Sequence, residues 1–179
     1  MRNVDILMAI LMSDDVLKEM HSKERLLFKI IPELAACKGF DQKSDWHCYD
    51  VWEHTIHSVA SCDKDPIDRL ALLLHDIGKP RCFQDNGNVR HFKGHAQKSA
   101  EMARPILKRL GVGPLHAQKI LFLIRNHATS IDDVDFENDE LLYIELLKIQ
   151  MCDASAYEPD HARSTLMRLR TKKNYSIIQ

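Results

Sequence analysis

Apolar residues recur along the chain at the spacing of helices separated by short turns. The clearest case has i, i+3, i+4 and i+7 spacing, which defines one buried face: Ile67, Leu70, Ala71 and Leu74. The same periodicity predicts eight helices, at Val4–Met20, Lys23–Ala36, Val51–Cys62, Pro66–Ile77, His95–Leu110, Pro114–His127, Asp139–Ala156 and Asp160–Lys172. Turn residues between two short segments indicate a β-hairpin near residues 82–92. The pattern therefore predicts an all-α bundle of about seven or eight helices with at most one short hairpin.

Glycine and proline mark where these helices end or break. Three glycines follow predicted helices and are expected in the left-handed conformation: Gly39, Gly78 and Gly111. Pro32 is expected to divide the second helix or to start a new one. Pro105 is expected to kink or restart the fifth helix.

Composition narrows the class of protein. The 179 residues, 45% of them hydrophobic, are enough for one domain with its own core, predicted to span residues 1–179. A net charge of −1 gives no general attraction to nucleic acid, so such a partner would need a local basic patch. Five cysteines without a Cys-x-x-Cys pair indicate reduced thiols and a cytoplasmic protein. The apolar run at residues 6–12 is too short for a membrane span, and no signal peptide is expected.

The unusual feature is a histidine beside an aspartate at the end of an apolar helix. His75 and Asp76 follow the run of leucines near residue 74 and are expected near the core. Burying a carboxylate lowers the stability of the folded protein by on the order of several kcal/mol unless a positive charge, hydrogen bonds or a metal ion compensates it. Taken alone, the pair is explained equally well by a His–Asp hydrogen bond that closes the helix.

Four further residues favour a metal site. His54 lies one turn into a helix, His95 opens one, His127 closes one, and Asp153 shares an apolar face with Leu146 and Ile149. With His75 and Asp76 they make six candidate ligands from five helices. Imidazole and carboxylate together suit one or two divalent ions, with Mn, Fe, Co, Ni, Mg or Zn as candidates.

The order of these residues resembles the HD superfamily of metal-dependent phosphohydrolases, which are all-helical. The likeness is closest to the HD domain of bacterial CCA-adding tRNA nucleotidyltransferases. It lies in the segments "SKERLLFKIIPELAACKGFDQKSDWHCYDVWEHTIHSV", "HDIGKP" and "FKGHAQKSA" and covers roughly residues 22–156, which leaves a C-terminal helix and tail at 157–179. The chain lacks the Gly-Ser and paired-Asp motif of the nucleotidyltransferase head, so nucleotide addition is not implied.

The resemblance implies a ligand assignment and a reaction. One ion would be held by His54, His75, Asp76 and Asp153, and a second by Asp76, His95 and His127, with Asp76 as the bridge. Water activated by the metal would attack the phosphorus of a nucleotide or related phosphoester, such as a cyclic phosphodiester or a 2′-phosphate. Lys79 is a candidate catalytic and phosphate-binding residue, although a lysine there also suits the end of a helix. Weaker substrate-binding candidates are Arg81, Lys93 and Arg125.

Other histidines and the tryptophans are expected to have ordinary roles. His57 is predicted to pack behind His54 rather than to bind metal. His91 falls in the hairpin and is a weaker ligand than His95. Surface or capping positions are predicted for His21, His47, His116 and His161, and core or pocket-wall positions for Trp46 and Trp52.

Three functions fit the motif. The first is a phosphohydrolase acting on a small nucleotide. The second is a non-catalytic HD module that binds tRNA or protein, with a structural or lost metal site and with tRNA or a separate nucleotidyltransferase as partner. The third is an HD enzyme of alarmone or cyclic-dinucleotide signalling, which ranks last because no Glu-Asp pair follows Asp76 at the expected position and no Gly-Tyr-Pro occurs.

Overall fold

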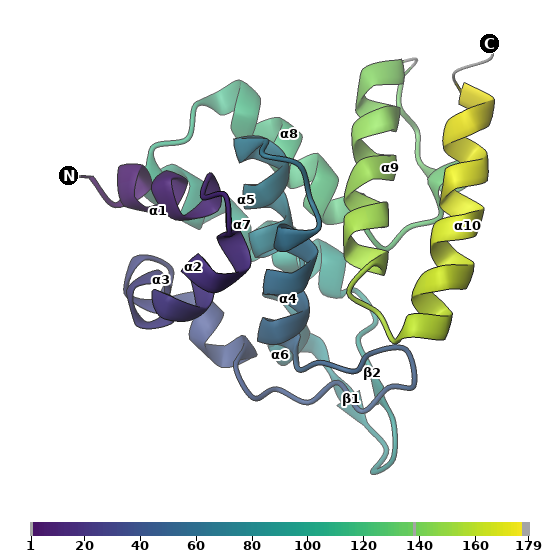
Figure 1. Cartoon of the computed structure of the whole chain (residues 1–179), viewed down its shortest axis with the longest axis horizontal. Coiled ribbons are helices and arrows are strands. Elements are labelled where there is room, and N and C mark those ends of the chain that lie inside the picture. The colour runs from purple at the N-terminus through teal and green to yellow at the C-terminus, as the bar shows by residue number, and fades with distance from the viewer. Residues whose placement is uncertain (1, 138, 177–179) are drawn as a thin grey trace.

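The computed structural model describes residues 2–137 and 139–176, and in that part the chain is a bundle of helices with one small hairpin (Figure 1). This confirms the all-α class. The last three residues of the predicted tail, 177–179, lie outside the described residues. The α-helices are α1 (Asn3–Leu11), α2 (Val16–Ser22), α3 (Glu24–Ile30), α4 (Val51–Ala60), α5 (Pro66–Leu74), α6 (Lys79–Cys82), α7 (His95–Leu110), α8 (Pro114–Asn126), α9 (Glu140–Ala154) and α10 (Pro159–Ser176).

The described residues form more helices than the predicted seven or eight for two reasons. Two predicted helices are each divided in two, and two short helices, α6 and the 3₁₀ helix η2 (Ile131–Asp133), were not predicted. The first predicted helix ends at Leu11 and restarts after Asp15, whose carboxylate accepts a hydrogen bond from the backbone N–H of Lys18 at 3.1 Å. Pro32 starts a 3₁₀ helix, η1 (Pro32–Cys37), as expected. The predicted hairpin is present as β1 (Gln84–Asp85) and β2 (Arg90–His91).

The structure corrects one glycine prediction and excludes one of two alternatives for a proline. Pro105, expected to kink or restart a helix, lies within α7, which runs without interruption from His95 to Leu110, so no restart occurs there. Gly78 has φ −81° and is not left-handed, unlike Gly39 at +70° and Gly111 at +74°. Gly78 is instead required by a close approach: a Cβ there would lie 2.6 Å from the backbone nitrogen of Ser99 and 2.8 Å from the carbonyl oxygen of His95.

Buried apolar residues from α1 to α10 form one contiguous cluster, with α4 and α5 at its centre (Figure 1). Trp52 of α4 is fully buried and meets the edge of Phe28 at 5.0 Å between ring centroids, which confirms its core position. The helices α8 and α9 pack against α5, and α10 packs on the outer side of α9. The ends of α4, α5, α8 and α9 and the start of α7 therefore meet near one point. Among the described residues, none of the helices has both the length and the apolar composition of a membrane span.

Candidate metal centre

The structure brings together all six predicted ligands. His54 comes from α4, His75 and Asp76 from the turn after α5, and the other three from the ends of their helices: His95 at the start of α7, His127 directly after α8, and Asp153 in the last turn of α9. Five of the six are buried, and His95 is partly exposed. Residues far apart in sequence therefore meet in one interior cluster.

Asp76 lies at the centre and its two oxygens face different histidines. Oδ2 is 3.2 Å from Nε2 of His75 and 3.6 Å from Nε2 of His54. Oδ1 is 3.4 Å from Nε2 of His95 and 3.6 Å from Nε2 of His127. The carboxylate thus divides the cluster into two halves, the arrangement that a bridging ligand requires.

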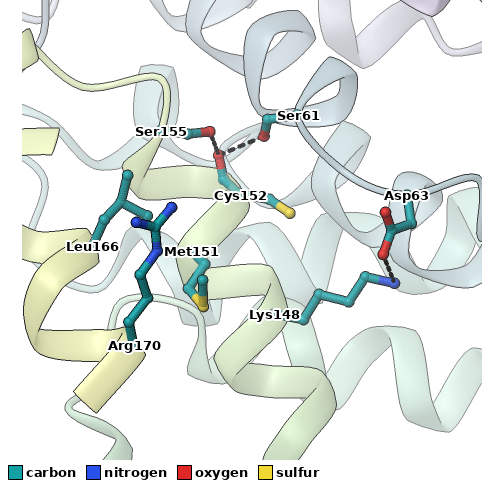
Figure 2. A pocket seen from close by; sticks show the side chains of 8 residues that line it. All are labelled: Ser61, Asp63, Lys148, Met151, Cys152, Ser155, Leu166 and Arg170. Atoms are coloured by element: carbon teal, nitrogen blue, oxygen red, sulfur yellow. Dashed lines mark hydrogen bonds and ion pairs between the residues drawn. The ribbon is translucent and has the colours of Figure 1, made fainter. Parts of the chain in front are cut away.

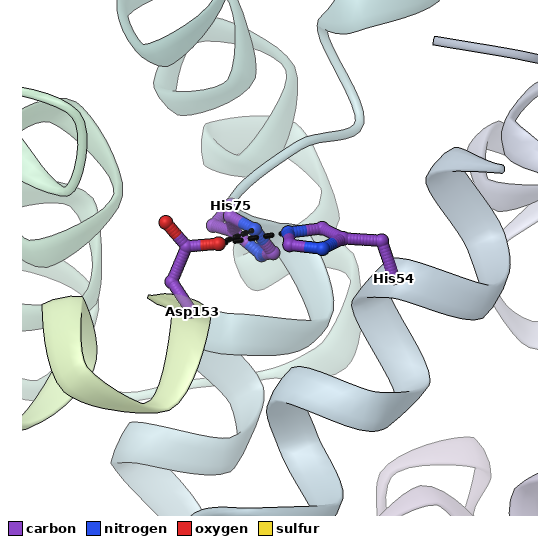
Figure 3. Close-up of side chains that lie close together, drawn as sticks. All are labelled: His54, His75 and Asp153. Carbon is purple, nitrogen blue, oxygen red and sulfur yellow. Dashed lines mark hydrogen bonds and ion pairs between the residues drawn. The ribbon is translucent and has the colours of Figure 1, made fainter. Parts of the chain in front are cut away.

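Asp153 completes the first half. Its Oδ1 lies 2.7 Å from Nε2 of His54 and 3.4 Å from Nε2 of His75, so one oxygen faces both imidazoles (Figure 3). The ligand atoms of these three residues all lie within 4.8 Å of one another, as do those of His75, Asp76 and His127. Each set of atoms is close enough to share one ion.

Backbone carbonyls set the direction of the four histidines. In three of them Nδ1 lies on the carbonyl oxygen three residues earlier: His75 on Leu72 at 2.6 Å, His127 on Ile124 at 2.7 Å, and His95 on Phe92 at 2.8 Å. Nδ1 of His54 lies 3.3 Å from the carbonyl oxygen of Ala156. A carbonyl only accepts, so each Nδ1 carries the proton and each Nε2 points into the cluster with a lone pair in the neutral ring. This orientation is the usual one for metal-binding histidines.

The cluster fits a metal ion because several of its inward atoms make no hydrogen bond, and in the described part of the chain the only cation beside Oδ2 of Asp76, other than the histidines, is the ammonium of Lys79. Among the described residues, Nε2 of His75 and both oxygens of Asp76 are buried without a hydrogen-bond partner. Nε2 of His95 and of His127 face each other at 3.2 Å, which requires a proton or a cation between them. Buried polar atoms without partners are costly, and nitrogen and carboxylate ligands suit Mn, Fe, Co, Ni and Zn.

Positive groups of the protein partly compensate the negative charge of the Asp76 carboxylate. Nζ of Lys79 lies 2.7 Å from Oδ2 of Asp76. Burial works against the charged forms, yet the charges of His75 and Lys79 hold the pKa of Asp76 well below its usual range. Burial likewise opposes the imidazolium of His75, but the charges of Asp76 and Asp153 and their close contacts with the ring together outweigh it and raise the pKa of His75 to about 10. A metal ion at Nε2 of His75 would therefore displace a proton. Burial lowers the pKa of His95 to about 4, so this ring is neutral near pH 7.

Two groups of contacts hold Asp153 in place. The carbonyl of the preceding residue, Cys152, accepts hydrogen bonds from the hydroxyls of Ser61 at 3.0 Å and Ser155 at 2.7 Å, which joins the ends of α4 and α9 (Figure 2). The hydroxyl of Tyr157 donates to Oδ2 of Asp153 at 3.0 Å, leaving Oδ1 for the histidines. Asp153 is therefore positioned before any ion binds.

Removing the Tyr157 hydroxyl should weaken metal binding without unfolding the protein. In Tyr157→Phe the ring remains, but Oδ2 of Asp153 loses its donor. We expect a loss of about 10–100-fold in affinity for Mn²⁺, the usual effect of losing a partner of a metal ligand. Titration of metal-free wild type and variant measures it, and equal affinities would exclude this role for Tyr157.

Two residues near the cluster, His47 and Trp46, lie elsewhere than their sequence positions predicted. His47, predicted at the surface, packs edge-on against His54 at 5.1 Å and Tyr157 at 5.2 Å between ring centroids. Burial lowers the pKa of His47 to about 3. Trp46 was predicted in the core or in a pocket wall, and this was wrong: it is 50% exposed, and its ring centroid lies 4.4 Å from that of His161. Both precede α4 in a segment without helical periodicity, so no sequence pattern placed them here.

The predicted second histidine of α4 and the predicted substrate-binding residues differ in how deeply they are buried. His57 stacks on Tyr49 at 4.3 Å, as expected of a packed residue. Lys79 is only 5% exposed and also donates to Oε1 of Gln42 at 2.7 Å, so it is not a solvated cation at a helix end. The weaker substrate-binding candidates all have exposed side chains: Arg81, Lys93 and Arg125.

A family comparison agrees with this geometry. The HD domain family model matches residues 47–158, more than half of the chain. The chain belongs to the HD domain family. The matched segment contains all six residues of the cluster, and proteins of the HD domain family are generally metal-dependent hydrolases.

Individual relatives of this HD domain are tRNA nucleotidyltransferases, as the sequence resemblance predicts. The A-adding tRNA nucleotidyltransferase of Deinococcus radiodurans is 30% identical over 168 residues, which cover 85% of this chain and 38% of that protein. The CC-adding tRNA nucleotidyltransferase of Thermus thermophilus is 36% identical over 109 residues, covering 57% of this chain and 25% of that protein. The Multifunctional CCA protein of Burkholderia orbicola is 32% identical over 105 residues, covering 56% and 25%. The chain thus spans less than two thirds of each of these relatives.

Proposed function

We propose that this HD domain is a metal-dependent phosphohydrolase that acts on a nucleotide or a related phosphoester. The observation that carries the proposal is the two-sided cluster around Asp76, in which four imidazole Nε2 atoms and two carboxylates converge in the interior. Such a cluster is costly in a metal-free protein, because several of its buried polar atoms have no hydrogen-bond partner among the described residues. A structural role for His75 and Asp76 alone would not require the other four ligands.

The residues would divide between two ions. His54, His75, Asp76 and Asp153 would hold the first, and Asp76, His95 and His127 the second, which matches the two faces of the Asp76 carboxylate. Divalent ions in such a site lower the pKa of water and neutralise charge on phosphoryl oxygens. The protein supplies fixed ligand directions through the backbone carbonyls bound by each Nδ1.

Lys79 is the proposed phosphate-binding residue. Gln42, itself buried, holds its ammonium beside Asp76, so the positive charge is fixed next to the cluster rather than free in solvent. A phosphate oxygen close to Asp76 could accept from this ammonium. Arg81, Lys93 and Arg125 remain candidates for contacts with the outer parts of a substrate.

A second candidate function is binding to tRNA or to a separate nucleotidyltransferase, with the metal site as a structural element. The similarity to tRNA nucleotidyltransferases favours this second function. Those relatives are much longer than the segment that they share with this chain. A phosphohydrolase and a binding module make opposite predictions about turnover.

Removal and return of metal tests the two candidates. The protein is stripped with a chelator and assayed with Mn²⁺, Co²⁺, Ni²⁺, Zn²⁺ or Mg²⁺ on a 2′,3′-cyclic nucleotide, a 2′-nucleotide and a dinucleoside polyphosphate. The proposal expects no turnover without metal and restored turnover of at least one substrate with it. Stoichiometric metal binding without turnover of any phosphoester, together with metal-independent affinity for tRNA, would favour the binding module.

A further inference from the structure

A cavity of about 390 Å³ adjoins the metal centre on the side of α10. It lies between the segment 127–132, the end of α9 and one face of α10, and the two helices run side by side in Figure 1. His127 and Asp153 both line it, one from each half of the cluster. A second cavity, of about 250 Å³, is lined by none of the six ligands (Figure 2). The cavity of about 390 Å³ therefore borders a residue from each half of the cluster.

The helix α10 presents a polar face to this cavity. Thr165, Arg168 and Lys172 line it at i, i+3 and i+7, the spacing of one helical face. The other lining residues include Thr129 and Ser130, which carry hydroxyl groups, and Tyr157, whose hydroxyl already donates to Asp153. The lining is rich in hydrogen-bond donors, and the volume is in the range of small-molecule sites.

The cavity lining carries two cations, Arg168 and Lys172, and two carboxylates, Asp132 and Asp153. Lys172 is paired with Asp132, whereas Arg168 has no acidic partner within the part of the chain that the structure describes. Arg168 lines the same cavity as Asp153 and His127, so its guanidinium borders the space that adjoins the metal centre. A free guanidinium beside donor hydroxyls is the chemistry that binds a phosphate group.

We infer that this cavity is an anion subsite in which Arg168, with Lys172 beside it, binds a second phosphate group of the substrate. The inference rests on the proposed function for the first phosphate, which would lie at the Asp76 cluster. Preferred substrates would then carry two separate phosphates, as a nucleoside 3′,5′-bisphosphate does, rather than a single one.

Equilibrium binding of non-hydrolysable analogues tests the subsite. The probes are phosphonate analogues of adenosine 3′-monophosphate and adenosine 3′,5′-bisphosphate, titrated calorimetrically into Mn²⁺-loaded protein at constant ionic strength. Arg168→Gln should weaken binding of the bisphosphonate by about 10–100-fold, as expected for a hydrogen bond to a charged group, and should affect the monophosphonate much less. Arg168 is exposed, so the substitution should not alter folding or metal content.

Two further variants make the result specific. Arg163→Gln removes the same charge from the same helix, but Arg163 is 83% exposed and does not line the cavity, so both affinities should stay at the wild-type value. Asp132→Asn frees Lys172 from its ion pair and should tighten bisphosphonate binding several-fold.

Each outcome separates the subsite from the proposed function. Equal affinities of wild type for the two analogues, or equal effects of Arg168→Gln and Arg163→Gln, would overturn the subsite even if the enzyme hydrolyses nucleotides. A selective effect of Arg168→Gln in a protein that turns over no phosphoester would support the subsite and overturn the hydrolase.

Discussion

Replacing Asp76 by asparagine is expected to abolish phosphoester hydrolysis, with a loss of about a thousandfold or more in turnover. The side chain keeps its shape but loses the negative charge that both halves of the cluster share. Both proposed ions would lose a ligand at once, so metal content should fall together with activity. Elemental analysis and turnover of the three phosphoesters, for wild type and Asp76→Asn under identical metal loading, measure the two effects.

A control must separate lost chemistry from lost stability. The ammonium of Lys79 is buried against Asp76, and leaving a buried charge unpaired costs about 3–5 kcal/mol of folding free energy. The double variant Asp76→Asn/Lys79→Met removes both charges and should recover most of that loss, while remaining inactive. Urea unfolding of the three proteins gives the free energies.

The outcome against the catalytic assignment is equally clear. If Asp76→Asn hydrolyses every substrate at the wild-type rate with every metal, Asp76 is not a ligand of a catalytic ion. If the double variant is stable, binds no metal and still binds tRNA as wild type does, the binding module becomes the better explanation.

The second large effect is expected from Gly78→Ala. A Cβ at this position would meet the backbone of Ser99 at 2.6 Å and of His95 at 2.8 Å, and backbone atoms of α7 cannot rotate away as the end of a long side chain can. Gly78 N also donates to the buried hydroxyl of Ser99 at 2.9 Å, which holds the turn after α5 against α7. We expect a loss of about 1–3 kcal/mol in the free energy of unfolding, the usual cost of overpacking.

This variant should also disturb one half of the metal centre more than the other. The clash moves the start of α7, which carries His95, away from Asp76, whereas His54 and Asp153 come from helices that do not contact Gly78 in this way. Isothermal titration with Mn²⁺ should therefore show the second binding event weakened more than the first. Gly113→Ala is the matched control, because Gly113 has φ −61° and open space around its Cβ position. Equal stability of the two variants would exclude close packing as the reason for Gly78.

Local sequence patterns alone determined most of the helices. Apolar spacing is a property of neighbouring residues, so helices such as α4 and α5 followed from the sequence. The six ligands were also identified from the sequence, because histidines and carboxylates at the buried ends of helices are unusual and their order resembles the HD superfamily.

Only the tertiary structure decided how these parts meet. The close approach of Gly78 to α7, the contact of His47 with His54, and the cavity that Arg168 shares with Asp153 all join segments distant in sequence. The division of the Asp76 carboxylate between two pairs of histidines likewise depends on the packing of four helices around one turn. The periodicity of apolar residues indicates which face of a helix is buried. It does not indicate which other helix packs on that face, because that depends on contacts between segments far apart in the sequence.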